Sequence, residues 1–176
     1  RLNALIAKFP KPYIAFMQGF TMGGGVGISC HGSHRIVCET SKIAMPECSI
    51  GLIPDVGGSL LLSRAPNNLG YFLGLTGTQM NAADAIYTGF ADSYIPKSEW
   101  PKVIDRLEQS GNNSILSQHS QNSGKSQLAE NREFFETTFT SKDLPKIVQF
   151  LSKSEDQIAI ETLNKITKNC PIAMTY

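Results

Sequence analysis

Residues 19–30 read Gly-Phe-Thr-Met-Gly-Gly-Gly-Val-Gly-Ile-Ser-Cys, and they follow a short apolar run, Tyr-Ile-Ala-Phe-Met, at 13–17. Pro12 and Gly19 bound that run, which predicts a buried strand. The glycine run then opens an apolar segment that ends near Cys30, which predicts a helix beginning at the glycines. A strand that turns through glycines into a helix is the unit of an α/β protein, so this stretch decides the fold class.

The alternation of short strands and helices continues to about residue 110. Strands are predicted at 34–38, 42–44 and 93–95, and helices at 1–9, 59–64, 67–75, 82–88 and 98–110. Asn81 is a suitable N-cap for the fourth of these helices, with Asp84 in its first turn, and Gly89 follows its end. We therefore predict an α/β core over residues 1–110.

Residues 111–127 have a different composition, in which Asn, Ser, Gln and Gly dominate. Such a segment buries too little apolar surface to order itself, so we predict a solvated polar connector. Apolar periodicity predicts helices at 128–139, 142–151 and 155–168, which form a helical region over 128–176. Both ends look cut, so we expect a fragment that lacks the N-terminal part of the core and the C-terminal part of the helical region.

The composition is that of a globular protein, with 41% hydrophobic and 18% charged residues among 176. A net charge of +1 and scattered basic residues argue against nucleic-acid or membrane partners bound through charge. No apolar run approaches the roughly 20 residues that span a bilayer. The cysteines at 30, 38, 48 and 170 lack metal-site spacing, so we predict no metal and favour a reducing, non-secreted location.

The glycine run is the first segment that could carry chemistry. Backbone N–H groups at a helix start can face an anion or a developing oxyanion, and glycine lets a ligand approach closely. The spacing matches neither a phosphate-binding loop nor a dinucleotide fingerprint. The alternative is a tight strand-to-helix turn without a ligand.

The second segment contains two carboxylates, Glu47 and Asp55, within an apolar stretch punctuated by proline and glycine at 45–58. Neither has a Lys or Arg within several residues, and an unpaired buried carboxylate is costly. Such groups usually have a function or stay protonated. The alternatives are that Asp55 caps the following helix and that Glu47 is an ordinary surface residue in a turn.

The remaining polar residues carry weaker signals. His31, His34 and His119 lack metal-ligand spacing, and we interpret His31 as a helix-end cap or a hydrogen-bonded packing residue. No Gly-x-Ser-x-Gly motif is present, which argues against a serine hydrolase triad.

Several segments, in this order, resemble the crotonase, or enoyl-CoA hydratase/isomerase, superfamily. They are Lys-Pro-Tyr-Ile-Ala at 11–15, Gly19, Met-Gly-Gly-Gly-Val-Gly at 22–27, Met-Pro-Glu at 45–47, Ile-Gly-Leu-Ile-Pro-Asp-Val-Gly-Gly at 50–58, Leu-Gly-Tyr-Phe-Leu at 69–73 and Leu-Thr-Gly at 75–77. The resemblance is dense over 10–96 and diffuse beyond, and it is strongest to the 3-hydroxyisobutyryl-CoA hydrolase branch.

The resemblance implies an α/β crotonase-like spiral of strand-strand-helix units followed by a C-terminal helical region. It implies that the Gly24 N–H binds the thioester oxygen, together with a second N–H from a segment upstream of Arg1. Loss of one such donor commonly lowers the rate about 10²–10³-fold, so we expect the isolated chain to be inactive.

Two positions separate the branches in this resemblance. Hydratases carry a catalytic glutamate where this chain has Gly27, whereas Glu47 matches a glutamate that hydratases also have. Asp55 and the string Pro-Asp-Val-Gly-Gly match the hydrolases. The resemblance therefore implies hydrolysis of a short branched 3-hydroxyacyl-CoA in valine degradation, with Glu47 and Asp55 as catalytic residues and Gly24 as the oxyanion amide.

The implied partner is an acyl-CoA substrate, and no separate cofactor is expected because CoA belongs to the substrate. A homo-oligomer fits the superfamily, and the location would be cytoplasmic in a bacterium or the mitochondrial matrix in a eukaryote. Two alternatives remain: another crotonase reaction, such as hydration, isomerisation or dehalogenation, and a role in the mitochondrial ribosome, which has recruited a relative of this hydrolase.

Overall fold

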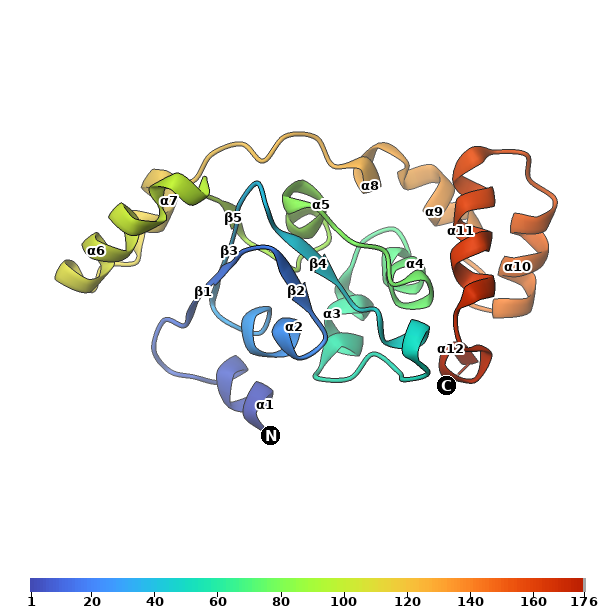
Figure 1. The fold of residues 1–176 in the computed structure, drawn as a ribbon, viewed down its shortest axis with the longest axis horizontal. Coiled ribbons are helices and arrows are strands. Elements are labelled where there is room, and N and C mark those ends of the chain that lie inside the picture. Colours follow the sequence, from blue (N-terminus) through green and yellow to red (C-terminus); the bar gives the residue numbers. More distant parts are fainter. Residues whose placement is uncertain (176) are drawn as a thin grey trace.

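The computed structural model describes residues 1–175 (Figure 1). The core contains α1 (Leu2–Ala7), β1 (Ile14–Met17), β2 (Phe20–Met22), α2 (Gly24–Ser29), β3 (His34–Val37), β4 (Lys42–Ala44), the 3-10 helix η1 (Glu47–Ile50), α3 (Gly58–Arg64), α4 (Leu69–Thr76), α5 (Ala82–Tyr87) and β5 (Ser93–Tyr94). The remaining elements are η2 (Lys97–Glu99), α6 (Trp100–Ser110), α7 (Ser114–His119), α8 (Gln127–Glu130), α9 (Arg132–Thr138), α10 (Leu144–Ser152), α11 (Gln157–Lys168) and α12 (Pro171–Thr175).

The core repeats a strand-strand-helix unit, first as β1-β2-α2 and then as β3-β4-η1-α3. Equivalent strands pair in parallel: β1, β3 and β5 form one sheet, and β2 and β4 form another. In the first sheet Phe16 lies opposite Ile36, and in the second Thr21 lies opposite Ile43. Because the repeats are in register, the turn that follows β2 and the turn that follows β4 lie side by side. The predicted α/β core of strand-strand-helix units, followed by a helical C-terminal region, is confirmed.

Two apolar clusters support this arrangement. The larger lies beneath α2, α3 and α4 and includes Met17, Val26, Ile43, Met45, Leu61, Leu69 and Phe72. The smaller surrounds Trp100, whose ring lies 5.0 Å from Phe16 between centroids and whose indole N–H donates to Ile95 O at 2.9 Å. The hydrogen bond lets a large polar-tipped ring be buried at little cost.

Helices α3 and α4 approach one another closely at Gly70. A Cβ atom there would lie 2.0 Å from the Leu62 carbonyl oxygen, so only glycine fits. Helix α4 also packs against η1, which fixes the segment that carries Glu47.

The prediction that residues 111–127 form an unordered connector is wrong. Helix α7 lies within this segment, and its Ile115 and Leu116 are buried in the Trp100 cluster. His119 Nδ1 contacts Glu99 Oε2 at 2.6 Å, and the Gln121 N–H donates to Tyr94 O at 2.8 Å. Two adjacent apolar residues suffice here because they pack on the apolar cluster around Trp100. After α7 the chain crosses from one end of the molecule to the other (Figure 1).

The crossing segment is fixed at its far end by Asp84, which is buried. One carboxylate oxygen accepts hydrogen bonds from Ser126 Oγ at 2.7 Å and from the Leu128 N–H at 3.1 Å. The single helix predicted over 128–139 is two helices, α8 and α9, separated at Asn131. The Asp84 carboxylate thus joins the core to the start of the helical region.

The helical region packs on α4 and η1. The Phe72 ring lies 4.5 Å from Phe135 and 5.9 Å from Phe139, measured between ring centroids. At the other end, Asn169 Nδ2 donates to Leu75 O at 2.7 Å, and the Cys170 N–H donates to Cys48 O at 2.9 Å. These contacts bring α12 against η1, beside Glu47.

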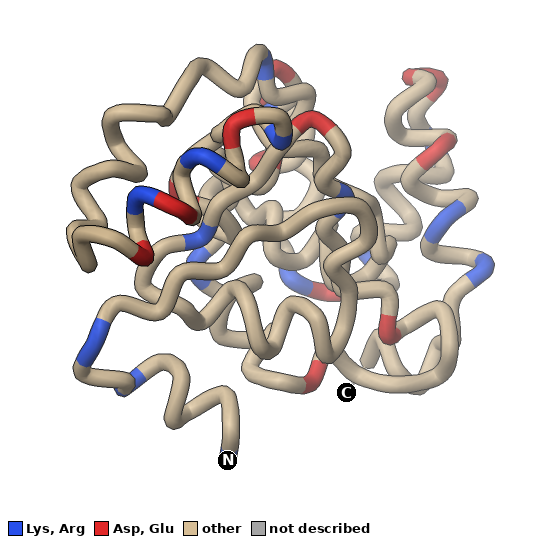
Figure 2. Tube along the Cα trace, turned by 60° about the vertical axis from the view of Figure 1, so that its left-hand side comes forward, with Lys and Arg blue, Asp and Glu red and all other residues tan. Residues whose placement is uncertain are grey.

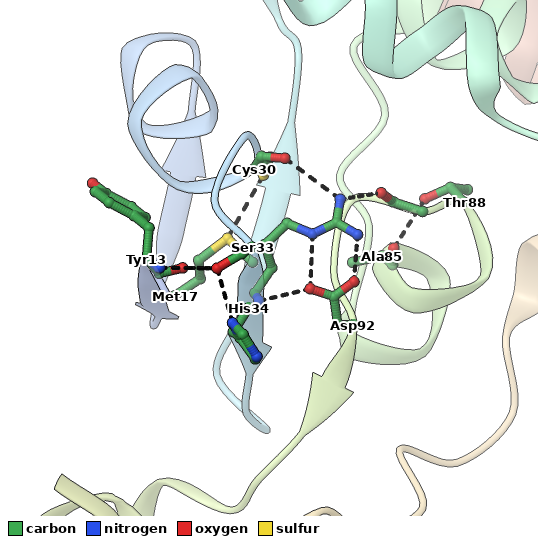
Figure 3. A network of polar contacts seen from close by, with 10 residues as sticks. Tyr13, Met17, Cys30, Ser33, His34, Ala85, Thr88 and Asp92 are labelled. Atoms are coloured by element: carbon green, nitrogen blue, oxygen red, sulfur yellow. Dashed lines mark hydrogen bonds and ion pairs between the residues drawn. The ribbon is translucent and has the colours of Figure 1, made fainter. Parts of the chain in front are cut away.

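Polar contacts tie the end of α2 to β3 and α5, as Figure 3 shows around Cys30, His34 and Asp92. The Arg35 guanidinium forms an ion pair with Asp92 and donates to Cys30 O and Gly89 O. Acidic and basic residues are otherwise interspersed along the fold (Figure 2). Within residues 1–175, every helix is too short or too polar to cross a bilayer.

Candidate active site

Glu47 is the first residue of η1 and is buried, with 4% of its surface exposed. Its carboxylate lies against the glycine run: a Cβ atom on Gly23 would stand 3.0 Å from Glu47 Oε1. The two side-by-side turns of the repeat create this contact, because η1 follows β4 as the glycine run follows β2. The alternative in which Glu47 is an ordinary surface turn residue is wrong.

The glycine run bends sharply before α2. Gly23 has φ 49° and ψ −115°, a conformation that side chains with a Cβ rarely adopt. Helix α2 starts at Gly24, and the first N–H groups of a helix have no acceptor within it. A Cβ atom on Gly24 would meet no atom within 4 Å among residues 1–175. Open space therefore lies next to this part of the backbone, beside the Glu47 carboxylate.

The space at Gly27 is filled. A Cβ atom there would lie 2.7 Å from Val56 Cβ and 2.8 Å from Asn3 Nδ2, closer than such atoms approach in proteins. Gly27 thus lacks both a carboxylate and the room to hold one. A glutamate at this position, which the resemblance leads us to expect in hydratases, would have no room here.

Asp55 lies in an exposed turn that precedes α3. The Gly58 N–H donates to Asp55 O at 2.6 Å and closes the turn, while α3 has Gly57 at its N-cap and no side-chain cap. The capping alternative for Asp55 is therefore wrong. Val56 has φ 48° and Gly57 has φ 81°. Positive φ costs a β-branched residue about 1–3 kcal/mol of conformational free energy, so it persists only where surrounding contacts offset that cost.

Two side chains hold the Val56 carbonyl oxygen. Asn3 Nδ2 donates to it at 2.8 Å, and His31 Nε2 lies 2.9 Å from it. His31 is therefore a hydrogen-bonded packing residue, as one of the two interpretations expected. It is not the helix-end cap, because Cys30 is the C-cap of α2. Sequence reasoning missed Asn3, which sits 53 positions from its partner in a short terminal helix without a motif.

The electrostatics of Glu47 follow from its burial. Burial raises the pKa of the Glu47 carboxyl above its ordinary value. A hydrogen bond from the residue's own backbone partly offsets this rise in pKa, and the negative charge of Asp55 adds a smaller one. Within residues 1–175, Glu47 Oε2 is buried without a hydrogen-bond partner. Glu47 is therefore held as a group whose charged form is costly.

A cavity of about 420 Å³ adjoins this site. Cys48, Ile53 and Pro54 line it from the segment between the two acids, and Tyr71 and Met174 line it from α4 and α12. Among residues 1–175, neither Glu47 nor Asp55 contributes to its lining. The cavity is thus adjacent to the acid pair and separate from it.

Residues 1–175 contain no cluster of His, Cys, Asp or Glu suited to a metal ion. Three cysteines are buried and Cys170 is half-buried. Burial raises the pKa of the Cys30 thiol to about 12 and also raises that of Cys48. Buried protonated thiols of this kind are poor nucleophiles.

Two solved structures match almost the whole chain. A carnitinyl-CoA dehydratase from Mycobacterium thermoresistibile superposes with a TM-score of 0.94 at 42% identity, covering 98% of this chain and 51% of that one. An enoyl-CoA hydratase from Rhodobacter sphaeroides gives a TM-score of 0.92 at 44% identity, covering 99% and 50%. The fold is therefore that of this group of CoA enzymes.

Among curated proteins, the mitochondrial 3-hydroxyisobutyryl-CoA hydrolase of Mus musculus is 35% identical over 98% of this chain and 48% of its own length. The small ribosomal subunit protein mS47 of Neurospora crassa is 44% identical over 62% of this chain and 22% of its own length. That of Schizosaccharomyces pombe is 34% identical over 96% and 39%. The chain thus spans half or less of the length of these relatives.

The family model described as enoyl-CoA hydratase/isomerase matches residues 1–176. The match covers both the α/β core and the helical region, including the glycine run and the two acids. Together with the hydrolase relatives, it shows that this chain belongs to the enoyl-CoA hydratase/isomerase family.

Proposed function

We propose that the full-length protein hydrolyses a short branched 3-hydroxyacyl-CoA thioester, with 3-hydroxyisobutyryl-CoA as substrate and 3-hydroxyisobutyrate and CoA as products, in valine degradation. One observation carries the proposal: the buried Glu47 carboxylate lies at the glycine run, while the space at Gly27 is taken by Val56 and Asn3. Addition of water to a double bond by two glutamates is not supported, because the second glutamate is missing. Thioester cleavage needs only the single glutamate that is present, Glu47.

In the proposed reaction the thioester oxygen accepts a hydrogen bond from the Gly24 N–H. A second donor comes from a part of the protein N-terminal to Arg1. Such preorganised donors stabilise the negative charge that develops on the oxygen as the carbonyl carbon becomes tetrahedral. Open space next to Gly24 supports this assignment.

Glu47 acts on the carbonyl carbon by one of two routes. In the first, a carboxylate oxygen bonds to that carbon, CoA leaves as thiolate, and water then hydrolyses the anhydride. In the second, Glu47 accepts a proton from water as the water attacks the carbonyl carbon, and the C–S bond then breaks as CoA leaves as the thiol with that proton. Rapid quenching followed by mass spectrometry distinguishes them, because only the first route leaves the acyl group on the Glu47 peptide.

Asp55 binds the substrate hydroxyl or assists proton transfer in this proposal. Its exposed carboxylate and its effect on the pKa of Glu47 support a position at the mouth of the same site. No separate cofactor takes part, since CoA arrives with the substrate.

The test is release of free CoA thiol from 3-hydroxyisobutyryl-CoA by the full-length protein. Crotonyl-CoA serves as the control, with loss of the enoyl absorbance reporting hydration. Thiol release without enoyl loss supports the hydrolase. Enoyl loss without thiol release would instead assign another reaction of this family.

A second candidate function is a structural role in the small subunit of the mitochondrial ribosome. The mS47 relatives favour it, because one is more similar over its matched segment than the hydrolases are. Co-sedimentation of the full-length protein with small ribosomal subunits tests this role. Retention of both acids supports the enzymatic function alongside it, since a purely structural protein needs neither.

The relatives named as mitochondrial support a location in the mitochondrial matrix if the source is a eukaryote, and the cytoplasm is the counterpart in a bacterium. Crotonase-like relatives also make a homo-oligomer a reasonable expectation. Fractionation and size-exclusion chromatography of the full-length protein test these two points.

A further inference from the structure

The turn that carries Asp55 has an unusual backbone. Val56 and Gly57, its two central residues, both have positive φ, at 48° and 81°. Glycine adopts such angles freely, but valine does so only where neighbouring groups hold it. The exposed Asp55 side chain takes its position from this backbone, because α3 draws no cap from it.

Two donors from separate elements meet on the Val56 carbonyl oxygen. Asn3 of α1 donates from 2.8 Å, and His31, just after α2, contacts the oxygen from 2.9 Å. A carbonyl oxygen only accepts, so His31 Nε2 carries the hydrogen of this bond. We call the Asn3 and His31 side chains, with the carbonyl oxygen they share, the turn clamp.

The side chains of the turn clamp pack tightly against two glycines. A Cβ atom on Gly57 would lie 2.6 Å from His31 Nε2, and one on Gly27 would lie 2.8 Å from Asn3 Nδ2. Because His31 follows α2, whose first residue is Gly24, the clamp connects the far end of the glycine-opened helix to the Asp55 turn. The clamp thus fixes the position of the Asp55 turn relative to α2, the helix that carries the proposed oxyanion amide of Gly24.

We propose that His31 and Asn3 are positioning residues, which hold the strained Asp55–Gly57 turn and with it the Asp55 carboxylate that the proposed hydrolysis uses. This inference rests on the proposed thioester hydrolysis for its kinetic test. It assigns no contact of either side chain with substrate. Their effect on turnover passes through Asp55.

The kinetic test uses the full-length protein and three variants. His31→Leu removes the donor, His31→Gln keeps an amide donor of similar reach, and His34→Leu is a matched control that removes a histidine bonded to Ser33 and Asn113 instead. We expect His31→Leu to lower kcat about 10–100-fold with KM changed less than about threefold. His31→Gln should recover most of the loss, and His34→Leu should match the parent.

A double-mutant cycle separates positioning from general stability. In the Asp55→Asn background, His31→Leu should lower kcat by less than about twofold more, because the group it positions is already disabled. Asn3→Leu should behave in the same way. Equal losses from His31→Leu with and without Asp55 intact would overturn the proposal, as would a His31→Gln variant no better than His31→Leu.

A structural readout keeps the clamp testable if the parent releases no CoA, an outcome that rejects the proposed function alone. Crystal structures of the full-length parent and of His31→Leu should then show Val56 leaving positive φ only in the variant. An unchanged turn in His31→Leu would overturn the clamp independently of any activity.

Discussion

Gly27 and Val56 occupy one small space, since a Cβ atom on Gly27 would lie 2.7 Å from Val56 Cβ. Helix α2 and the Asp55 turn are therefore packed backbone against side chain at this point. A glycine is required here for space, although its φ is ordinary. Position 27 is also the one at which we expect hydratases to carry a glutamate instead of glycine.

Gly27→Ala should destabilise the full-length protein by about 1–3 kcal/mol, because the added methyl group overpacks the contact with Val56 and Asn3. Gly27→Glu should be worse, and it should not confer hydration of crotonyl-CoA. Thermal unfolding checks the first expectation. Gly25→Ala is the matched control, since its new Cβ would meet Thr21 Cγ2 at an ordinary 3.7 Å. Equal unfolding temperatures for the two alanine variants would contradict the packing argument.

Glu47→Gln should lower the rate of CoA release about 10²–10⁴-fold, since the amide neither attacks the carbonyl carbon nor accepts a proton from water. Ser49→Ala, in the same 3-10 helix but exposed, is the control and should leave the rate unchanged. Thiol release from 3-hydroxyisobutyryl-CoA is the measurement. Near-normal release by Glu47→Gln would remove Glu47 from the chemistry.

The raised pKa of Glu47 also predicts a pH dependence of stability. The folded state holds a proton on this carboxyl more tightly than the unfolded state does, so stability falls as pH rises from the ordinary pKa of 4.5 through the raised value. Glu47→Gln removes that loss. The variant should unfold at nearly the same temperature as the parent near pH 4 and at a higher temperature near pH 8. A gain that is the same at both pH values would be inconsistent with burial of a titrating carboxyl.

Asp55→Asn should lower kcat for hydrolysis about tenfold or more, and it should raise KM by a smaller factor. Removal of its negative charge should also lower the pKa of Glu47, so the acid limb of the pH–rate profile should move to lower pH. Unfolding temperature should hardly change, because the side chain is exposed. An unshifted acid limb would indicate that the two carboxyl groups act independently.

Arg35→Met should destabilise the protein by about 1.5–3 kcal/mol, because it leaves Asp92 and two backbone carbonyls without their charged donor (Figure 3). Lys125→Met tests the method, since the Lys125–Glu130 pair is exposed and should contribute less than about 1 kcal/mol. Similar losses in both variants would mean that the network around β3 adds little beyond a surface ion pair.

Local patterns predicted the elements of the core well. The strand at 13–17, the helix opened by the glycines and the Asn81 cap all follow from short-range chemistry, and the structure contains each of them. Glu47 and Asp55 also stood out locally, as charges without a neighbouring partner. Their catalytic roles stay predictions until the variants are measured.

The missed features depend on contacts distant in sequence. Helix α7 is polar by composition and becomes ordered through Ile115 and Leu116 on the Trp100 cluster. Asn131 divides the predicted helix over 128–139, where Asp84 fixes the start of α8 from 44 positions away. Asn3 likewise finds its partner 53 positions away. Periodicity and composition carry no information about such pairings.

Cys170, directly before α12, has a half-buried thiol. Its backbone N–H donates to Cys48 O, next to Glu47. Because Cys30, Cys38 and Cys48 are shielded, a maleimide dye should attach at Cys170 before any of them. The label would then report by fluorescence when an acyl group enters beside η1. Binding could be followed in this way even in variants that no longer turn over, with Cys170→Ser as the blank.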